Sequence, residues 1–149
     1  ARGAIRNLAD LDPTEFDGVF LPGGYGAALN LSDLALAGAG IQVEPTLATF
    51  LTRAHQAGKV LGAVCIAPPI LAKVLSDAGV TGVRLTIGND SGTADVIRSL
   101  GQTHVDCAAE SCVVDKAHRI VTGPAYMLAT GIAQLHRGID TAIAAFLSL

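Results

Sequence analysis

The sequence predicts an α/β protein, with a doubly wound and mostly parallel sheet that has helices on both faces. Two observations carry this prediction: short apolar runs alternate with segments of helical periodicity, and glycine, proline or polar residues separate them. Such alternation is typical of β-α-β units, in which each helix covers one face of a parallel sheet. A third observation, a polar turn between two apolar runs, adds a small antiparallel hairpin.

Each expected element follows from the residues that begin, line and end it. The strands are short apolar runs, and the helices carry apolar side chains three and four residues apart. Gly138 is expected to break the last helical segment, and Asp140 could cap a second helix after it. In chain order we expect a strand over 18–22, a helix over 44–56, a strand over 59–64, a helix over 66–75, a strand over 84–87, a helix over 93–100, hairpin strands over 111–114 and 119–122 around the loop Asp115–His118, and a mostly helical segment over 126–149.

The chain is expected to form a single domain over residues 1–149. This length can bury a sizeable core, and 50% of the residues are hydrophobic whereas only 15% are charged. The first strand lies close to the start of the chain. We therefore expect either a domain truncated at its N-terminal side, without the βα unit that usually opens such a sheet, or an unusually small sheet.

Charge and composition exclude several classes of partner. A net charge of −3 with scattered Lys and Arg gives no basic surface for nucleic acid or an anionic membrane. No apolar run approaches the roughly 20 residues that span a bilayer. The three cysteines, Cys65, Cys107 and Cys112, are too few and odd in number for a disulfide framework, so a reducing cytoplasm is expected. Cys107 and Cys112 have no partner pair at zinc spacing, so no metal is expected.

Cys65 is the candidate catalytic residue. It directly follows a buried strand and precedes a helix, so we expect it at the carboxyl edge of the sheet, where open α/β sheets place their sites. The start of the next helix would offer free backbone N–H groups and the positive end of a helix dipole, which favour a thiolate. A small apolar residue buried in the core is the alternative, and it is the interpretation that fits Cys107 and Cys112.

The glycine-rich segment after the first strand is the second candidate element. Glycines let the backbone approach a ligand with its N–H groups directed into a site. The amides of Gly24 and Ile66 are therefore expected to form an oxyanion hole, with a plain glycine turn as the alternative. Asp90 and Tyr126 are candidates for the pocket as well. The alternative for Asp90 is a role as a loop cap, and the alternative for Tyr126 is simple packing. The possible pocket residues are Gly23, Tyr25, Asp90 and Tyr126.

Five segments of the chain resemble the ElbB-type glyoxalase family, also known as the sigma cross-reacting or isoprenoid-biosynthesis ElbB proteins. This family lies in the PfpI-type branch of the class I glutamine amidotransferase-like superfamily. The resemblance covers nearly the whole chain and keeps the family's order. Its segments are Leu21-Pro-Gly-Gly-Tyr-Gly-Ala-Ala-Leu-Asn-Leu-Ser32, His55-Gln-Ala-Gly-Lys59, Cys65-Ile-Ala-Pro68, Leu85-Thr-Ile-Gly88 and Val121-Thr-Gly-Pro-Ala-Tyr-Met-Leu128.

The resemblance implies a flavodoxin-like fold and a homodimer in which Cys65 is the nucleophile. It also implies conversion of glyoxal or similar small 2-oxoaldehydes to hydroxy acids without a cofactor. Two departures from the family pattern accompany it. Relatives supply a glutamate base from an N-terminal region that is absent here, so the base cannot be named. PfpI-type proteases carry a histidine directly after the cysteine, where this chain has Ile66, which disfavours a Cys-His protease.

Two other functions stay open at this point. The first is a non-catalytic scaffold, redox-responsive or partner-binding, in which Cys65 is oxidised to sulfinic acid. The second is a hydrolase of the amidotransferase type, which would need a histidine near Cys65. The four histidines of the chain are expected on the solvated surface without matched partners.

Overall fold

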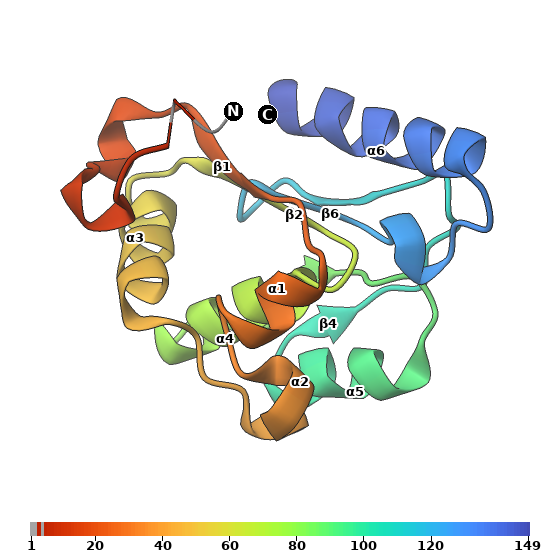
Figure 1. Ribbon diagram of the computed structural model, residues 1–149, viewed down its shortest axis with the longest axis horizontal. Helices are drawn as coiled ribbons and strands as arrows, with labels where there is room; N and C mark the ends of the chain where they lie inside the picture. The colour runs from red at the N-terminus through yellow and green to blue at the C-terminus, as the bar shows by residue number, and fades with distance from the viewer. Residues whose placement is uncertain (1–2, 4) are drawn as a thin grey trace.

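The computed structural model describes Gly3 and residues 5–149 (Figure 1). Its regular elements are β1 (Gly18–Leu21), α1 (Tyr25–Leu29), α2 (Leu34–Ala37), α3 (Pro45–Gln56), β2 (Val60–Val64), α4 (Pro68–Asp77), β3 (Arg84–Leu85), α5 (Ser91–Ser99), β4 (Thr103–His104), β5 (Val113–Asp115), β6 (Ile120–Gly123) and α6 (Ile132–Leu147), with short 3₁₀ turns at Leu8–Asp10, Pro13–Glu15, Gly38–Gly40 and Ala125–Met127. Strands and helices alternate along the middle of the chain, from β2 to β4, and α1, α2 and β4 are additional to the predicted elements.

The main sheet has four strands in the order β1-β2-β6-β5. Strands β1, β2 and β6 are parallel, and β5 pairs antiparallel with β6 as the predicted hairpin. All five residues of β2 are buried, which explains why this strand is a continuous apolar run. The mixed α/β class with a mostly parallel sheet is therefore confirmed.

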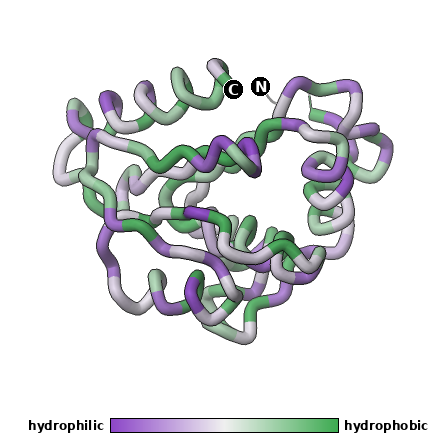
Figure 2. Tube along the Cα trace, turned by 180° about the vertical axis from the view of Figure 1, so that it is seen from behind, coloured by the Kyte–Doolittle hydropathy of each residue, from purple (hydrophilic) through white to green (hydrophobic). Residues whose placement is uncertain are grey.

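Helices cover both faces of this sheet (Figure 1). Helices α3 and α4 pack on one face, and α6 lies across the other. On the α6 face the rings of Phe20 and Phe146 meet edge to face with centroids 5.3 Å apart. Gly18 and Gly62 leave room for this pair, because a Cβ at either position would meet the Phe146 ring. Figure 2 shows hydrophobic residues running along the strands between these layers.

Three expectations about elements are wrong. The run over 84–87 forms only the two-residue strand β3, which pairs with β4 in a separate small sheet and does not join the main one. The last helix begins at Ile132, six residues later than expected, and continues through Gly138 without a break. Gly138 is buried inside α6 because the Ala109 carbonyl lies where its Cβ would be. Glycine serves close packing there and does not end the helix.

No helix among Gly3 and residues 5–149 is long and apolar enough to cross a membrane.

The buried polar side chains form hydrogen bonds with the protein's own backbone. Gln102 is 5% exposed, accepts from the Val83 amide at 3.0 Å and donates to the Val80 carbonyl at 2.8 Å. It thereby satisfies two backbone groups of the connection between α4 and β3.

Replacing Gln102 with leucine is expected to lower the free energy of unfolding by about 2–4 kcal/mol, because the buried Val83 N–H and the partly buried Val80 C=O would lose their partners. Urea denaturation followed by circular dichroism measures this change. The exposed Gln56→Leu variant is the matched control and should change stability by less than about 0.5 kcal/mol. Equal stability of the two variants would contradict the expectation.

Candidate functional site

Cys65 lies on a tight turn between β2 and α4. Its φ is 62°, in the left-handed region that residues with side chains rarely adopt, at a cost of about 1–2 kcal/mol. Its amide donates to the Gly123 carbonyl at 3.0 Å, and the Ala67 amide closes the turn on the Val64 carbonyl at 3.2 Å. The turn holds a partly exposed thiol at the carboxyl edge of the sheet, in the strand-to-helix elbow that the sequence predicts.

Gly23 brings the glycine loop into contact with this elbow. Its φ is +83°, and a Cβ there would lie 2.8 Å from the Cβ of Cys65 and 2.7 Å from the Val64 carbonyl oxygen. Only glycine fits such a contact without displacing the elbow. The two candidate elements of the sequence, the loop after β1 and the turn after β2, are therefore neighbours in space.

The backbone donors near Cys65 are fewer than expected. Helix α4 begins at Pro68, not directly after Cys65, and its first two residues are prolines, which have no N–H. The Ala67 amide is already bonded within the turn. In the part of the chain that the structure describes, the amides of Gly24 and Ile66 have no hydrogen-bond acceptor. These two amides are the donors proposed for the oxyanion hole.

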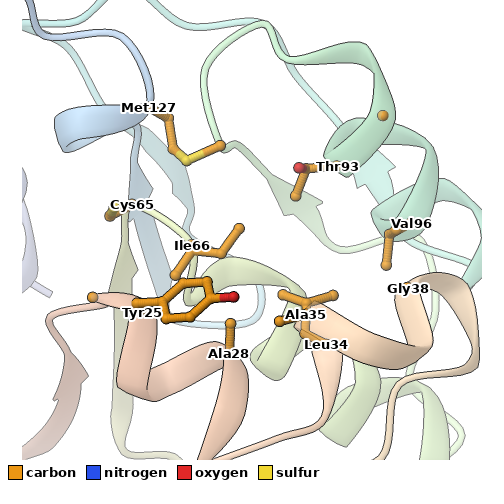
Figure 3. A pocket seen from close by; sticks show the side chains of 12 residues that line it. Tyr25, Ala28, Leu34, Ala35, Gly38, Cys65, Ile66, Thr93, Val96 and Met127 are labelled. Carbon is orange, nitrogen blue, oxygen red and sulfur yellow. The ribbon is translucent and has the colours of Figure 1, made fainter.

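A cavity of about 540 Å³ opens beside the elbow (Figure 3). Cys65, Ile66 and Gly24 form part of its wall, so the cysteine and the residues of both candidate donors border the same space. The rest of the wall comes from α1, α2 and α5, together with Gly38 from the 3₁₀ turn after α2 and Met127 from the 3₁₀ turn after β6. The site therefore combines a cysteine, two free amides and an open, mostly apolar cavity at the carboxyl edge of a parallel sheet.

Of the four residues predicted from the sequence as possible pocket residues, only Tyr25 belongs to the cavity lining. Tyr25 lines the cavity from the start of α1 and is 73% exposed, so it stands at the rim. Gly23 supports the elbow from behind the lining. Tyr126 is 61% exposed and does not line the cavity, whereas its neighbour Met127 does. Asp90 is also outside the lining and is the N-cap of α5, where its carboxylate accepts from the Thr93 amide at 2.8 Å.

Replacing Asp90 with alanine is expected to lower the free energy of unfolding by about 1 kcal/mol near pH 7. Hydrogen bonds from the Thr93 side chain and amide lower the pKa of Asp90 below its ordinary value of 3.8. Because the pKa is lowered on folding, this stabilisation is present above pH 3.8 and is lost as the pH falls through the folded-state value. Asp90→Asn should keep the cap without its acid dependence, which thermal unfolding from pH 7 to pH 2.5 measures. An identical acid dependence in Asp90→Asn and in the parent protein would contradict the assignment.

Sequence reasoning missed the far wall of the cavity. Helices α1 and α2 have five and four residues, too short to show a helical period, and they were not predicted. Ala35 and Gly38 on this side, and Val96 from α5, line the space opposite the thiol. Their small or apolar side chains carry no chemical signal that a sequence alone would single out.

The histidines lie away from the cavity lining, but two expectations about them are wrong. The His104 side chain is fully buried and accepts from the Ile87 amide at 3.3 Å, and burial lowers its pKa. His118 is not unpartnered, since it stacks on His55 and its Nδ1 lies 3.1 Å from the carboxylate of Asp115. Among the described residues, no group of three or more His, Cys, Asp or Glu side chains could hold a metal ion.

The fold and the elbow define a protein of the class I glutamine amidotransferase-like type, with a cysteine at the strand-to-helix turn. More narrowly, the chain belongs to the DJ-1/PfpI family, which matches residues 5–131. It is 37% identical to the mitochondrial glutamine amidotransferase-like class 1 domain-containing protein 3 of Homo sapiens and 35% identical to the mitochondrial ES1 protein homolog of Rattus norvegicus. Both alignments include the whole chain, which spans 57% and 58% of these two relatives.

Solved structures show the same fold. An isoprenoid biosynthesis protein with an amidotransferase-like domain from Ehrlichia chaffeensis superposes with a TM-score of 0.86 at 31% identity, covering 99% of this chain and 66% of that one. Glyoxalase III from Candida albicans superposes with a TM-score of 0.60 at 20% identity, covering 95% of this chain and 61% of that one. The second likeness is one of fold alone.

Proposed function

We propose that this protein is an ElbB-type, glyoxalase-like enzyme that converts small 2-oxoaldehydes to hydroxy acids without a cofactor, with Cys65 as the nucleophile. The observation that carries the proposal is the left-handed backbone of Cys65 at the border of a cavity. Strain of this kind persists only where the surroundings enforce it, and it is concentrated at functional sites. The Ehrlichia chaffeensis relative, an isoprenoid biosynthesis protein by name, supports the ElbB-type assignment.

The proposed reaction starts with addition of the Cys65 thiolate to one aldehyde carbon of glyoxal. The carbonyl oxygen takes up the electron pair as an oxyanion, which accepts hydrogen bonds from the amides of Gly24 and Ile66 and is then protonated to a hemithioacetal. A base moves the proton of that carbon to the neighbouring one, which gives a thioester of glycolate. Water then cleaves the thioester, so that glycolate leaves and the thiol is restored.

The general base of this scheme is proposed to be the glutamate that the family resemblance implies. No carboxylate or imidazole belongs to the cavity lining within the described residues, so this wall does not supply the base. The chain spans 57% of its human relative, and the glutamate of the resemblance comes from an N-terminal region. The proposal therefore divides the site between the elbow described here and another part of the protein.

Glyoxal consumption and glycolate formation by the intact protein test the proposal. Cys65→Ala should abolish both. Cys107→Ala is the matched control, because this cysteine is also partly exposed but does not line the cavity. Unchanged glyoxal consumption by Cys65→Ala would refute the proposal.

Among the described residues, the cavity lining holds no carboxylate or imidazole that could act as a base. This also favours a second candidate function, a redox-responsive or partner-binding scaffold. Peroxide would oxidise the Cys65 thiol to sulfinic acid, transferring two oxygen atoms to sulfur and releasing water from each peroxide. Intact-mass measurement after mild peroxide should then show this gain in the parent protein and not in Cys65→Ala. Equal gains in both proteins would contradict it.

Compartment and assembly are also part of the proposal. Three free cysteines suit a reducing compartment, and we propose the cytoplasm, although both curated relatives are mitochondrial by name. A homodimer is proposed from the family resemblance. Size-exclusion chromatography with light scattering measures the assembly directly.

A further inference from the structure

The cavity beside Cys65 is large for the substrate proposed above. Its volume of about 540 Å³ lies in the range of sites that enclose drug-sized ligands. Glyoxal consists of two linked aldehyde groups and would occupy a small part of that space. Most of the cavity would then remain unfilled by the substrate.

The wall of this cavity is chemically uniform. Its lining residues are Gly, Ala, Leu, Ile, Val, Met and Cys, apart from Tyr25 and Thr93, which bring hydroxyl groups. No charged side chain belongs to the lining as far as the structure describes the chain. An apolar wall favours an apolar group, because burying that group removes it from water. It disfavours a carboxylate or phosphate, whose charge would be desolvated without a partner.

The cavity also has a direction. In Figure 3, Cys65 lies at one end and Val96 and Gly38 lie at the other, with Ile66 and Ala35 in between. A ligand with its carbonyl at the thiol would therefore extend toward the space between α2 and α5.

We propose that the substrate is a 2-oxoaldehyde with a bulky, uncharged apolar substituent that binds between α2 and α5 while its aldehyde lies at Cys65. This inference rests on the proposed function and narrows its substrate class. The reaction is the one written above, with the apolar group replacing the hydrogen on the second carbonyl carbon. The product is the corresponding 2-hydroxy acid.

Initial rates on three probes test the substituent. Phenylglyoxal should have a kcat/KM about tenfold or more above that of glyoxal, because a well-filled apolar pocket discriminates by this factor for a single methylene. The charged analogue 4-carboxyphenylglyoxal should lose that advantage. Equal kcat/KM for phenylglyoxal and glyoxal would overturn the inference.

A pair of variants on α2 tests the location. Ala35 is exposed and lines the cavity, so Ala35→Phe should lower the ratio of phenylglyoxal to glyoxal kcat/KM by about tenfold. Ala37→Phe adds the same ring to the same helix at an exposed position outside the lining, and it should leave the ratio unchanged. If the ratio of phenylglyoxal to glyoxal kcat/KM were the same in both variants, the substituent would not bind beside Ala35, and the inference would be overturned.

Alkylation of Cys65 separates the two proposals, because it needs no turnover. N-benzyl iodoacetamide should modify Cys65 faster than iodoacetamide does, and Ala35→Phe should remove the difference. Peptide mass spectrometry measures both rates, with Cys107 as the internal reference. If Cys65→Ala leaves aldehyde consumption unchanged while Cys65 of the parent protein shows the benzyl preference, the glyoxalase proposal fails and the apolar pocket stands. If turnover depends on Cys65 but no benzyl preference appears, the pocket inference fails alone.

Discussion

Replacing Gly23 with alanine is expected to lower the free energy of unfolding by about 2–5 kcal/mol, the sum of left-handed strain and overpacking. The new Cβ would lie 2.8 Å from the Cβ of Cys65 and 2.7 Å from the Val64 carbonyl oxygen, and the φ of +83° would remain. Neither neighbour can yield without moving the elbow. Urea denaturation measures the loss, and the alkylation rate of Cys65 should change with it.

Gly24→Ala is the matched control for this prediction. Its φ of +88° is nearly the same, but no described atom beyond its own residue and its two chain neighbours lies within 4 Å of the position that a Cβ would occupy. Its ψ of 160° places it in a backbone region nearly exclusive to glycine, so only that backbone strain of about 1–3 kcal/mol should appear. Equal losses for the two variants would show that the contact between the glycine loop and the elbow contributes nothing to stability.

Replacing Cys65 with glycine is expected to move activity and stability in opposite directions. Because Cys65 is the proposed nucleophile, its removal should lower kcat by about a thousandfold or more. The φ of 62° costs glycine nothing, so relief of the strain should raise the free energy of unfolding by about 1 kcal/mol and the melting temperature by about 2–4 °C. Calorimetry and the glyoxal assay measure the two effects.

Cys65→Ala separates these effects, because alanine loses the thiol but keeps the strained backbone. It should be as inactive as Cys65→Gly without the gain in stability. A Cys65→Gly protein less stable than Cys65→Ala would mean that the elbow stores no strain at this residue.

The sequence predicted the fold and the elbow because both depend on local patterns. The β2 run is apolar throughout since the strand is buried on both faces, and Cys65 follows it directly. The break at Gly138 was predicted wrongly because a glycine in a helix has the same local signal whether it ends the helix or admits a neighbour. Only the tertiary contact with the Ala109 carbonyl distinguishes the two.

The wall of the cavity could not be predicted for a related reason. Residues such as Ala35 and Val96 gain their role from the place where α2 and α5 meet the elbow, and no motif marks them. The number of free amides was overestimated because it depends on where α4 begins. The sequence showed Pro68 and Pro69 near that start, but it did not show that they are the first two helical residues.

Those two prolines have a consequence for the kind of ligand that the elbow accepts. Sites that cradle nucleotides or sugar phosphates usually ring several oxygens with consecutive main-chain N–H groups at a helix start. Here that ring is interrupted, since Pro68 and Pro69 have no hydrogen on nitrogen and the Ala67 hydrogen is engaged within the turn. The elbow is thus suited to a single developing negative oxygen, and phosphorylated metabolites should compete poorly for it.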